Sequence, residues 1–231
     1  MNARPQSGAQ DQAVDALLAL LAENEWADVS LSRIAEKADL SLADLRAAFP
    51  SKGAILAGFA RRIDQSVLKP APEIEGQPAR ERLFDVVMRR FEALKPYKPA
   101  IRSARRGLLA DPIAASSWNK VEVNSAQWML AAAGITDSGA YAALKAQGLA
   151  VLFTNVLPVF LDDNDPDLTP TMRELDKQLR RAERMVETGA VVHKAVAPFL
   201  SAIAGLARRD ASARHCAPDD PQEESKVSSQ L

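Results

Sequence analysis

The chain has 231 residues, with 29 Lys and Arg, 30 Asp and Glu, and a formal net charge of −1. This balance excludes the strongly basic proteins that bind nucleic acid nonspecifically through charge alone. A single cysteine, Cys216, excludes a disulfide framework and predicts a reducing, cytoplasmic location. The longest apolar stretches, such as 148–161 and 195–207, are interrupted or too short to cross a bilayer, and the N-terminus lacks the apolar region of a signal peptide. Few glycines, many Ala and Leu, and no alternating β-branched runs predict an all-α fold.

The segment 29–55 predicts a helix-turn-helix followed by a third helix. Ser30 is placed to cap a first helix that ends near residue 38, and Ser41 with Asp44 forms a capping box at the start of a second. Pro50 ends the second helix, and Ser51 caps a third that runs to about residue 68. The apolar faces of the first two helices are expected to carry Leu31, Ile34, Ala35, Leu45 and Phe49.

A helix upstream of this motif is predicted to cover it. Val14, Leu17, Leu18 and Leu21 lie at helical spacing and form one apolar stripe. We therefore expect residues 10–69 to form one small helical domain, preceded by a disordered N-terminus over residues 1–9.

The motif resembles the N-terminal DNA-binding domain of the TetR family of bacterial regulators, through IAEKA at 34–38, LS at 40–41, Leu45 and FPSK at 49–52. The resemblance implies that the second helix of the pair enters the major groove and that a dimer binds a near-palindromic operator in double-stranded DNA. It also implies which residues meet DNA, and these are Ser30, Arg33, Ser41, Leu42, Arg46 and Lys52.

Charge on the predicted recognition helix is sparse. Residues 1–69 contain eight Lys and Arg against nine Asp and Glu, and Arg46 is the one basic side chain on that helix. Affinity for DNA then requires that the few cations lie on the contacting face or that a dimer doubles them. Asp44 either folds back to cap its helix or repels DNA, and Leu42 belongs either to the core or to the surface.

After a proline-containing linker at 69–78, the rest of the chain predicts a helical domain over residues 79–209. The TetR resemblance implies that this domain binds a ligand and forms the dimer. Helices are expected at about 79–95, 99–109, 112–134, 138–161, 169–187 and 190–209, with Asp111 capping the third of these. Residues 210–231 have the composition of a disordered tail.

An aromatic and methionine stripe on these helices is either bundle core or the wall of a ligand chamber. The stripe carries no charge, so a ligand there would be a small hydrophobic effector. The candidate ligand-binding residues are Phe84, Met88, Phe91, Trp118, Trp128, Met129 and Phe153.

The helix at 138–161 is apolar on more than one side, which predicts a partner. In the TetR family the last two long helices form a four-helix bundle with a second subunit, so the resemblance implies a homodimer. The monomer is possible if the last helix covers this surface, and Pro158 is expected to kink or shorten the end of the helix. The candidate interface residues are Leu149, Leu152, Val156, Phe160, Leu175 and Leu179.

A second resemblance begins at Leu83. The segments DNDPDL at 163–168 and TMREL at 171–175 resemble TetR-like accessory proteins of ubiquinone biosynthesis, which bind quinone precursors and lipid instead of DNA. Helix capping alone would also favour this pattern. The resemblance implies a rival function, a lipid- or isoprenoid-quinone-binding protein that contacts a membrane surface through 190–207.

The sequence offers little for an enzyme, and no catalytic residue, metal site or cofactor is predicted. His193 and His215 are the only histidines, and His215 with Cys216 is too few ligands for zinc. A basic cluster is either a solvated face or a contact for an anionic group; it consists of Lys95, Lys98, Arg102, Arg105 and Arg106. The TetR resemblance implies the function predicted here, a ligand-responsive transcriptional regulator that acts as a repressor.

Overall fold

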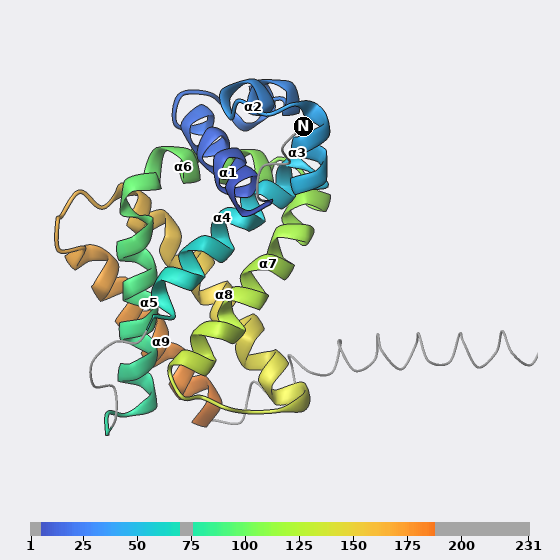
Figure 1. Ribbon diagram of the computed structural model, residues 1–231. Coiled ribbons are helices and arrows are strands. Elements are labelled where there is room, and N and C mark those ends of the chain that lie inside the picture. The colour runs from blue at the N-terminus through green and yellow to red at the C-terminus, as the bar shows by residue number, and fades with distance from the viewer. Residues whose placement is uncertain (1–5, 70–75, 188–231) are drawn as a thin grey trace, which may run out of the picture. The chain divides into compact units, whose positions relative to one another are not determined.

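The computed structural model describes residues 6–69 and 76–187, and every regular element within those ranges is helical. This confirms the all-α prediction. The α-helices (Figure 1) are α1 (Gln6–Glu23), α2 (Leu31–Lys37), α3 (Leu42–Ala48), α4 (Lys52–Val67), α5 (Ala79–Leu94), α6 (Lys98–Leu109), α7 (Pro112–Ala132), α8 (Gly139–Asp162) and α9 (Thr169–Glu187). Two short 3-10 helices are η1 (Trp26–Asp28) and η2 (Lys95–Tyr97). The helix predicted at 190–209 and the tail at 210–231 lie outside the described residues.

The N-terminal helix begins earlier than the sequence predicted. Residues 6–9 were expected in a disordered N-terminus, but α1 starts at Gln6. The reason is that Ala9 is already buried in the hydrophobic core, 7% exposed, so the first turn has a packing partner.

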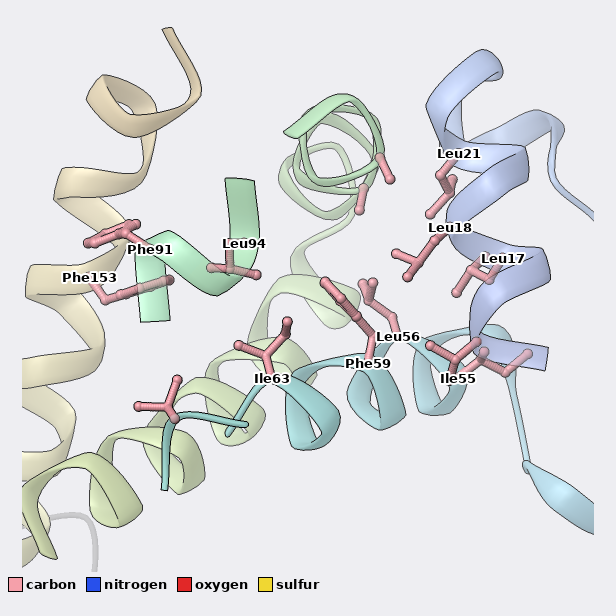
Figure 2. Packing of buried hydrophobic residues seen from close by; sticks show 14 of the residues in the cluster. Leu17, Leu18, Leu21, Ile55, Leu56, Phe59, Ile63, Phe91, Leu94 and Phe153 are labelled. Carbon is pink, nitrogen blue, oxygen red and sulfur yellow. The ribbon is translucent and has the colours of Figure 1, made fainter. Parts of the chain in front are cut away.

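The helices α2, α3 and α4 pack against α1. Figure 2 shows side chains of α1 and α4 meeting in this core, including Leu17, Leu21, Ile55 and Phe59, all of them buried. The i, i+3, i+4, i+7 stripe predicted for α1 thus faces the motif, as its spacing indicated.

The later helices pack around Phe91 of α5. Its ring stacks on Phe153 of α8 at a centroid distance of 4.7 Å and contacts Phe160 at 5.0 Å. Pro158 was expected to kink or shorten the end of α8; the helix is not shortened, since it continues to Asp162 with the proline inside it.

The N-terminal helices are joined to the later ones by both apolar and polar contacts. Phe59 of α4 packs edge-on against Tyr97 at 4.9 Å, and Ser103 of α6 donates a hydrogen bond of 2.7 Å to the Asn24 carbonyl oxygen. Residues 6–69 and 76–182 therefore share one core. The domain boundary at 69–78 stays a prediction.

Within the part of the chain that the structure describes, α8 alone is long and apolar enough to cross a bilayer. This corrects the expectation that 148–161 is too short, because the helix already begins at Gly139. Its most apolar window is 44% buried inside the fold, as in a core helix.

Candidate DNA-binding face and effector cavity

Three serines cap the helices of the helix-turn-helix as the sequence predicted. The hydroxyl of Ser30 accepts a hydrogen bond from the Arg33 amide at 3.2 Å, Ser41 accepts from the Asp44 amide at 3.0 Å, and Ser51 accepts from the Ala54 amide at 3.2 Å. These caps fix where α2, α3 and α4 begin.

The turn between α2 and α3 has a left-handed residue. Asp39 has φ +53°, a conformation that Asp tolerates better than most non-glycine residues. The amide of Leu40 closes the turn by donating to the Ala35 carbonyl oxygen at 2.9 Å.

Two cations expected at DNA are bound within the protein. Arg33 donates to the carbonyl oxygen of Asp28 at 2.8 Å and to Oδ1 of Asn24 at 3.2 Å. Lys52 donates to the carbonyl oxygens of Trp26 and Val29, at 2.6 and 2.7 Å, and burial lowers the pKa of its ammonium group. Both side chains therefore fix the segment before α2.

Arg46 and Lys37 are the exposed cations of α2 and α3. Neither has a hydrogen bond or ion pair among the described residues. Arg46 lies in the last turn of α3 and Lys37 in the last turn of α2.

The structure shows the positions of Leu42 and of the Asp44 carboxylate on α3. Leu42 is 56% exposed, so it lies on the surface. The Asp44 carboxylate folds back and accepts a hydrogen bond from the Ser41 hydroxyl at 2.7 Å. Leu31, expected in the core, is 44% exposed, because as the first residue of α2 it lies at the end of the helix, one turn before the buried pair Ile34 and Ala35.

A mostly apolar cavity of about 220 Å³ lies among α4, α5, α6, α7 and α8. The side chains from α4 that line it are Leu56, Phe59, Ala60 and Ile63. Apolar cavities with few polar groups are typical of sites for small molecules.

Two of the seven predicted ligand-binding residues, Trp118 and Phe153, line this cavity. Phe91, Met88 and Met129 are buried in the core, and Phe84 packs against it partly buried. Trp128 is 54% exposed and lines a second, more open hollow of about 520 Å³ between α4 and α7. Helical spacing could not assign each aromatic side chain to core, cavity or surface, because it does not fix which neighbouring helix each one meets.

A buried charged cluster, which the sequence analysis missed, borders the cavity. Arg90 is 2% exposed and lies 3.1 Å from a carboxylate oxygen of Glu122 and 3.5 Å from one of Asp64. Ser125 donates to the other Asp64 oxygen at 2.6 Å, and the guanidinium lies 4.4 Å from the centre of the Phe153 ring. The cluster joins α4, α5 and α7.

A signal for this cluster was present in the sequence. Arg90 occupies the same helical phase as Val86, Val87 and Leu94, which are buried. A charged residue at a buried phase indicates a buried ion pair, because an unpaired charge there is too costly.

Four members of the predicted basic cluster are held by acceptors within the chain. Lys98 donates to the Asp163 carbonyl oxygen, and the other three bind as follows: Lys95 to the Pro166 carbonyl oxygen at 2.7 Å, Arg102 to Asp162 at 2.7 Å, and Arg106 to Glu25 at 2.6 Å. Arg105 has no such partner in the described ranges, is partly buried, and lines the cavity.

The six residues predicted at a dimer interface lie in the core of a single chain. Their exposed fractions range from 0% to 6%, and they are Leu149, Leu152, Val156, Phe160, Leu175 and Leu179. Side chains already buried in this way have almost no surface left to bury against a partner. An interface on α8 would therefore use other residues, such as Val151 and Tyr141, which are 49% and 41% exposed.

The segment 163–168 is a network of turns and caps before α9. The carboxylate of Asp163 accepts from the Asp165 amide at 2.9 Å and from the Thr171 amide and hydroxyl at 3.1 and 2.6 Å. Burial would raise the pKa of Asp163, but these hydrogen bonds and the nearby Lys98 lower it. The capping explanation of this pattern is thus sufficient. Residues 190–207, the predicted membrane helix, lie outside the described residues.

No protein-family model matches the chain, and no curated sequence is significantly similar to it. Solved structures are similar in fold. A TetR transcriptional regulator from Nitrosomonas europaea is 22% identical with a TM-score of 0.60, over 75% of this chain and 97% of its own. A TetR-family regulator from Streptomyces coelicolor is 20% identical with a TM-score of 0.52, over 91% and 100%. FadR from Thermus thermophilus, a TetR-family repressor in complex with lauroyl-CoA, is 16% identical with a TM-score of 0.50, over 74% and 91%. The chain therefore has the fold of the TetR-family transcriptional regulators.

Proposed function

We propose that the chain is a ligand-responsive transcriptional regulator, a repressor that binds an operator as a homodimer and a small hydrophobic effector in the cavity. The observation that carries this proposal is the placement of α4. Its first residue, Lys52, is anchored to the segment before α2, and its Leu56, Phe59 and Ile63 line the cavity. One helix thus joins the helix-turn-helix to the ligand site.

An effector can act through this helix. A ligand that binds more tightly to one position of α4 stabilises one spacing of the two DNA-binding motifs in a dimer. The operator stabilises another spacing, so ligand and operator oppose each other. FadR, which is similar in fold, was solved in complex with lauroyl-CoA, a molecule with a long apolar chain. This similarity supports a hydrophobic effector for the present chain.

The DNA contact is proposed to centre on Arg46. Its side chain is exposed on α3 and donates no hydrogen bond to any described residue. Ser30, Ser41 and Leu42 are exposed near the starts of α2 and α3. Lys37 supplies a second exposed cation, whereas Arg33 and Lys52 position the helices through their internal hydrogen bonds. Two motifs in a dimer would double this small number of phosphate contacts.

A gel-shift assay with sheared genomic DNA of the source organism tests the proposal. We expect a shift that weakens as salt is raised and with Arg46→Ala, because the contact depends on phosphate neutralisation. Arg61→Ala is a matched control, since Arg61 is also exposed and has no partner in the described residues, but lies well along α4 from the motif. An unshifted pool at low salt would contradict DNA binding.

The second candidate is a lipid- or isoprenoid-quinone-binding accessory protein. The internal use of Arg33 and Lys52, together with exposed Leu31 and Leu42, favours it, because these features leave few cations for DNA. It predicts that lipid co-purifies with the protein and that deleting residues 190–231 abolishes liposome flotation. Clean mass spectra of gently purified protein and no flotation would exclude it.

A further inference from the structure

We propose that the effector of the cavity is an amphipathic anion, with an acidic head group bound by Arg105 and an apolar body in the cavity. The inference rests on the proposed effector role of the cavity and assigns the chemical class of the ligand. Arg105 differs from the other four cations of the basic cluster in its hydrogen-bond partners.

Among the residues that the structure describes, Arg105 is the member of the basic cluster without a hydrogen-bond or ion-pair partner. Lys95, Lys98, Arg102 and Arg106 each donate to a carbonyl or carboxylate oxygen of the chain. Arg105 is partly buried beside apolar side chains, yet no described residue accepts from it. A cation in this position gains more from an anionic ligand than a fully hydrated one would, since part of its water is already removed.

The position of Arg105 sets the orientation of the ligand. Leu109 lies one helical turn further along α6, lines the same cavity and is 64% exposed, so the cavity opens to solvent beside it. Arg105 is therefore near the mouth. Arg90 and Glu122 also line the cavity and are only 2% and 6% exposed, so they belong to its inner wall.

Charge at the inner wall supports the same orientation. Arg90 faces two carboxyl groups, those of Glu122 and Asp64, so the buried cluster has more acidic than basic groups. This excess disfavours a further acidic group at the inner end, and Glu122 already has Arg90 as its partner at 3.1 Å. An acidic head group is thus favoured at the mouth and an apolar chain inside, against Phe59, Ile63 and Leu157.

Three probes of equal chain length test the head-group charge on the full-length protein. Calorimetric titrations at neutral pH would compare octanoate, octan-1-ol and octylammonium. We expect octanoate to bind about tenfold more tightly than octan-1-ol, because a charge-assisted hydrogen bond to guanidinium is added to the same apolar contact. Octylammonium should bind more weakly than either.

Variants of Arg105 provide the second arm. Arg105→Gln should reduce octanoate affinity to that of octan-1-ol while leaving octan-1-ol affinity unchanged, and Arg105→Lys should retain part of the difference. Arg61→Gln removes the same charge from the second hollow and should change neither affinity. Thermal unfolding would confirm that each variant is folded.

The outcomes separate this inference from the proposed function. Equal affinities for octanoate and octan-1-ol, or a preference unaffected by Arg105→Gln, would overturn the anionic assignment and leave a hydrophobic effector site. Tightest binding of octylammonium would overturn it in favour of Glu122 as the anchor. Binding of none of the three would overturn the assignment together with the effector role, whereas DNA binding is measured independently.

Discussion

Lys52 binds Trp26 in two ways: its ammonium nitrogen lies 2.6 Å from the Trp26 carbonyl oxygen and 4.3 Å from the centre of the indole ring. A third contact, to the Val29 carbonyl oxygen at 2.7 Å, completes the arrangement. The first residue of α4 therefore holds the chain that leads into α2. The TetR resemblance assigns this lysine to a phosphate, and in this structure its ammonium group donates to two carbonyl oxygens of its own chain.

Replacing Lys52 by Met should destabilise the protein. The substitution removes two charge-assisted hydrogen bonds in a partly buried place, so we expect the free energy of unfolding to fall by about 1–3 kcal/mol in urea denaturation. Lys37→Met is the control, because Lys37 is exposed and makes no polar contact in the described chain. Wild-type stability in Lys52→Met would mean that these contacts contribute nothing.

Gly107 should not tolerate a methyl group. A Cβ there would lie 2.3–2.5 Å from Trp26 atoms that include its Cβ, which cannot move without the backbone of η1. We expect Gly107→Ala to lower the free energy of unfolding by about 1–3 kcal/mol, the usual cost of overpacking.

Gly148 is the matched control within a helix. A Cβ at this position of α8 meets nothing within 4 Å, so Gly148→Ala should raise stability by about 0.5–1 kcal/mol through helix propensity. Equal effects of the two substitutions in thermal unfolding would show that Gly107 is not packed against Trp26.

Local features of the fold were predictable from the sequence, because their causes lie within a few residues. Ser30, Ser41, Ser51 and Asp111 were each predicted as helix caps and each accepts an amide hydrogen bond at the start of its helix. Helix ends follow from such short-range contacts.

Features that depend on which helices meet were not predictable from spacing alone. The apolar excess of α8 predicted a partner subunit, but Leu149 and Phe160 are already buried within their own chain. The pairing of Arg90 with Asp64 and Glu122 joins three helices. Helical periodicity gives the phase of a side chain but not its partner.

Acid should weaken the turn before α9 through Asp163. The pKa of Asp163 is lowered below its ordinary 3.8 because the hydrogen bonds from Thr171 and Asp165 and the charge of Lys98 outweigh the effect of burial. The folded chain thus binds this proton less tightly than the unfolded chain. The carboxylate contributes stability that is present above pH 3.8 and is lost as the pH falls through the lower, folded-state pKa.

Asp163→Asn should remove that contribution. An amide can replace only one accepting oxygen, so we expect a loss of about 1–3 kcal/mol near neutral pH and a flatter fall of stability below pH 3.8. Asp167→Asn is the control, since its exposed carboxylate has no acceptor role in the described residues. An unchanged acid profile for Asp163→Asn, measured by urea denaturation at several pH values, would contradict this account.

Arg90→Met should be strongly destabilising. It leaves the carboxylates of Asp64 and Glu122 buried without their cation, for which we expect a loss of about 3–5 kcal/mol. Arg89→Met, at the next position of α5, removes an arginine without a polar partner in the described ranges and should change stability little. The triple change of Asp64, Arg90 and Glu122 to Leu, Met and Leu should recover most of the loss if the cost comes from unpaired charge.

Selection of bound fragments from sheared genomic DNA at low salt would show whether this helix-turn-helix binds a specific DNA site, as we propose. We predict enrichment of a near-palindromic sequence whose half-sites lie about 34 Å apart, one helical turn. Enrichment should be lost with Arg46→Ala and kept with Arg61→Ala. Sequencing that recovers no enriched site with the wild-type protein would contradict the account.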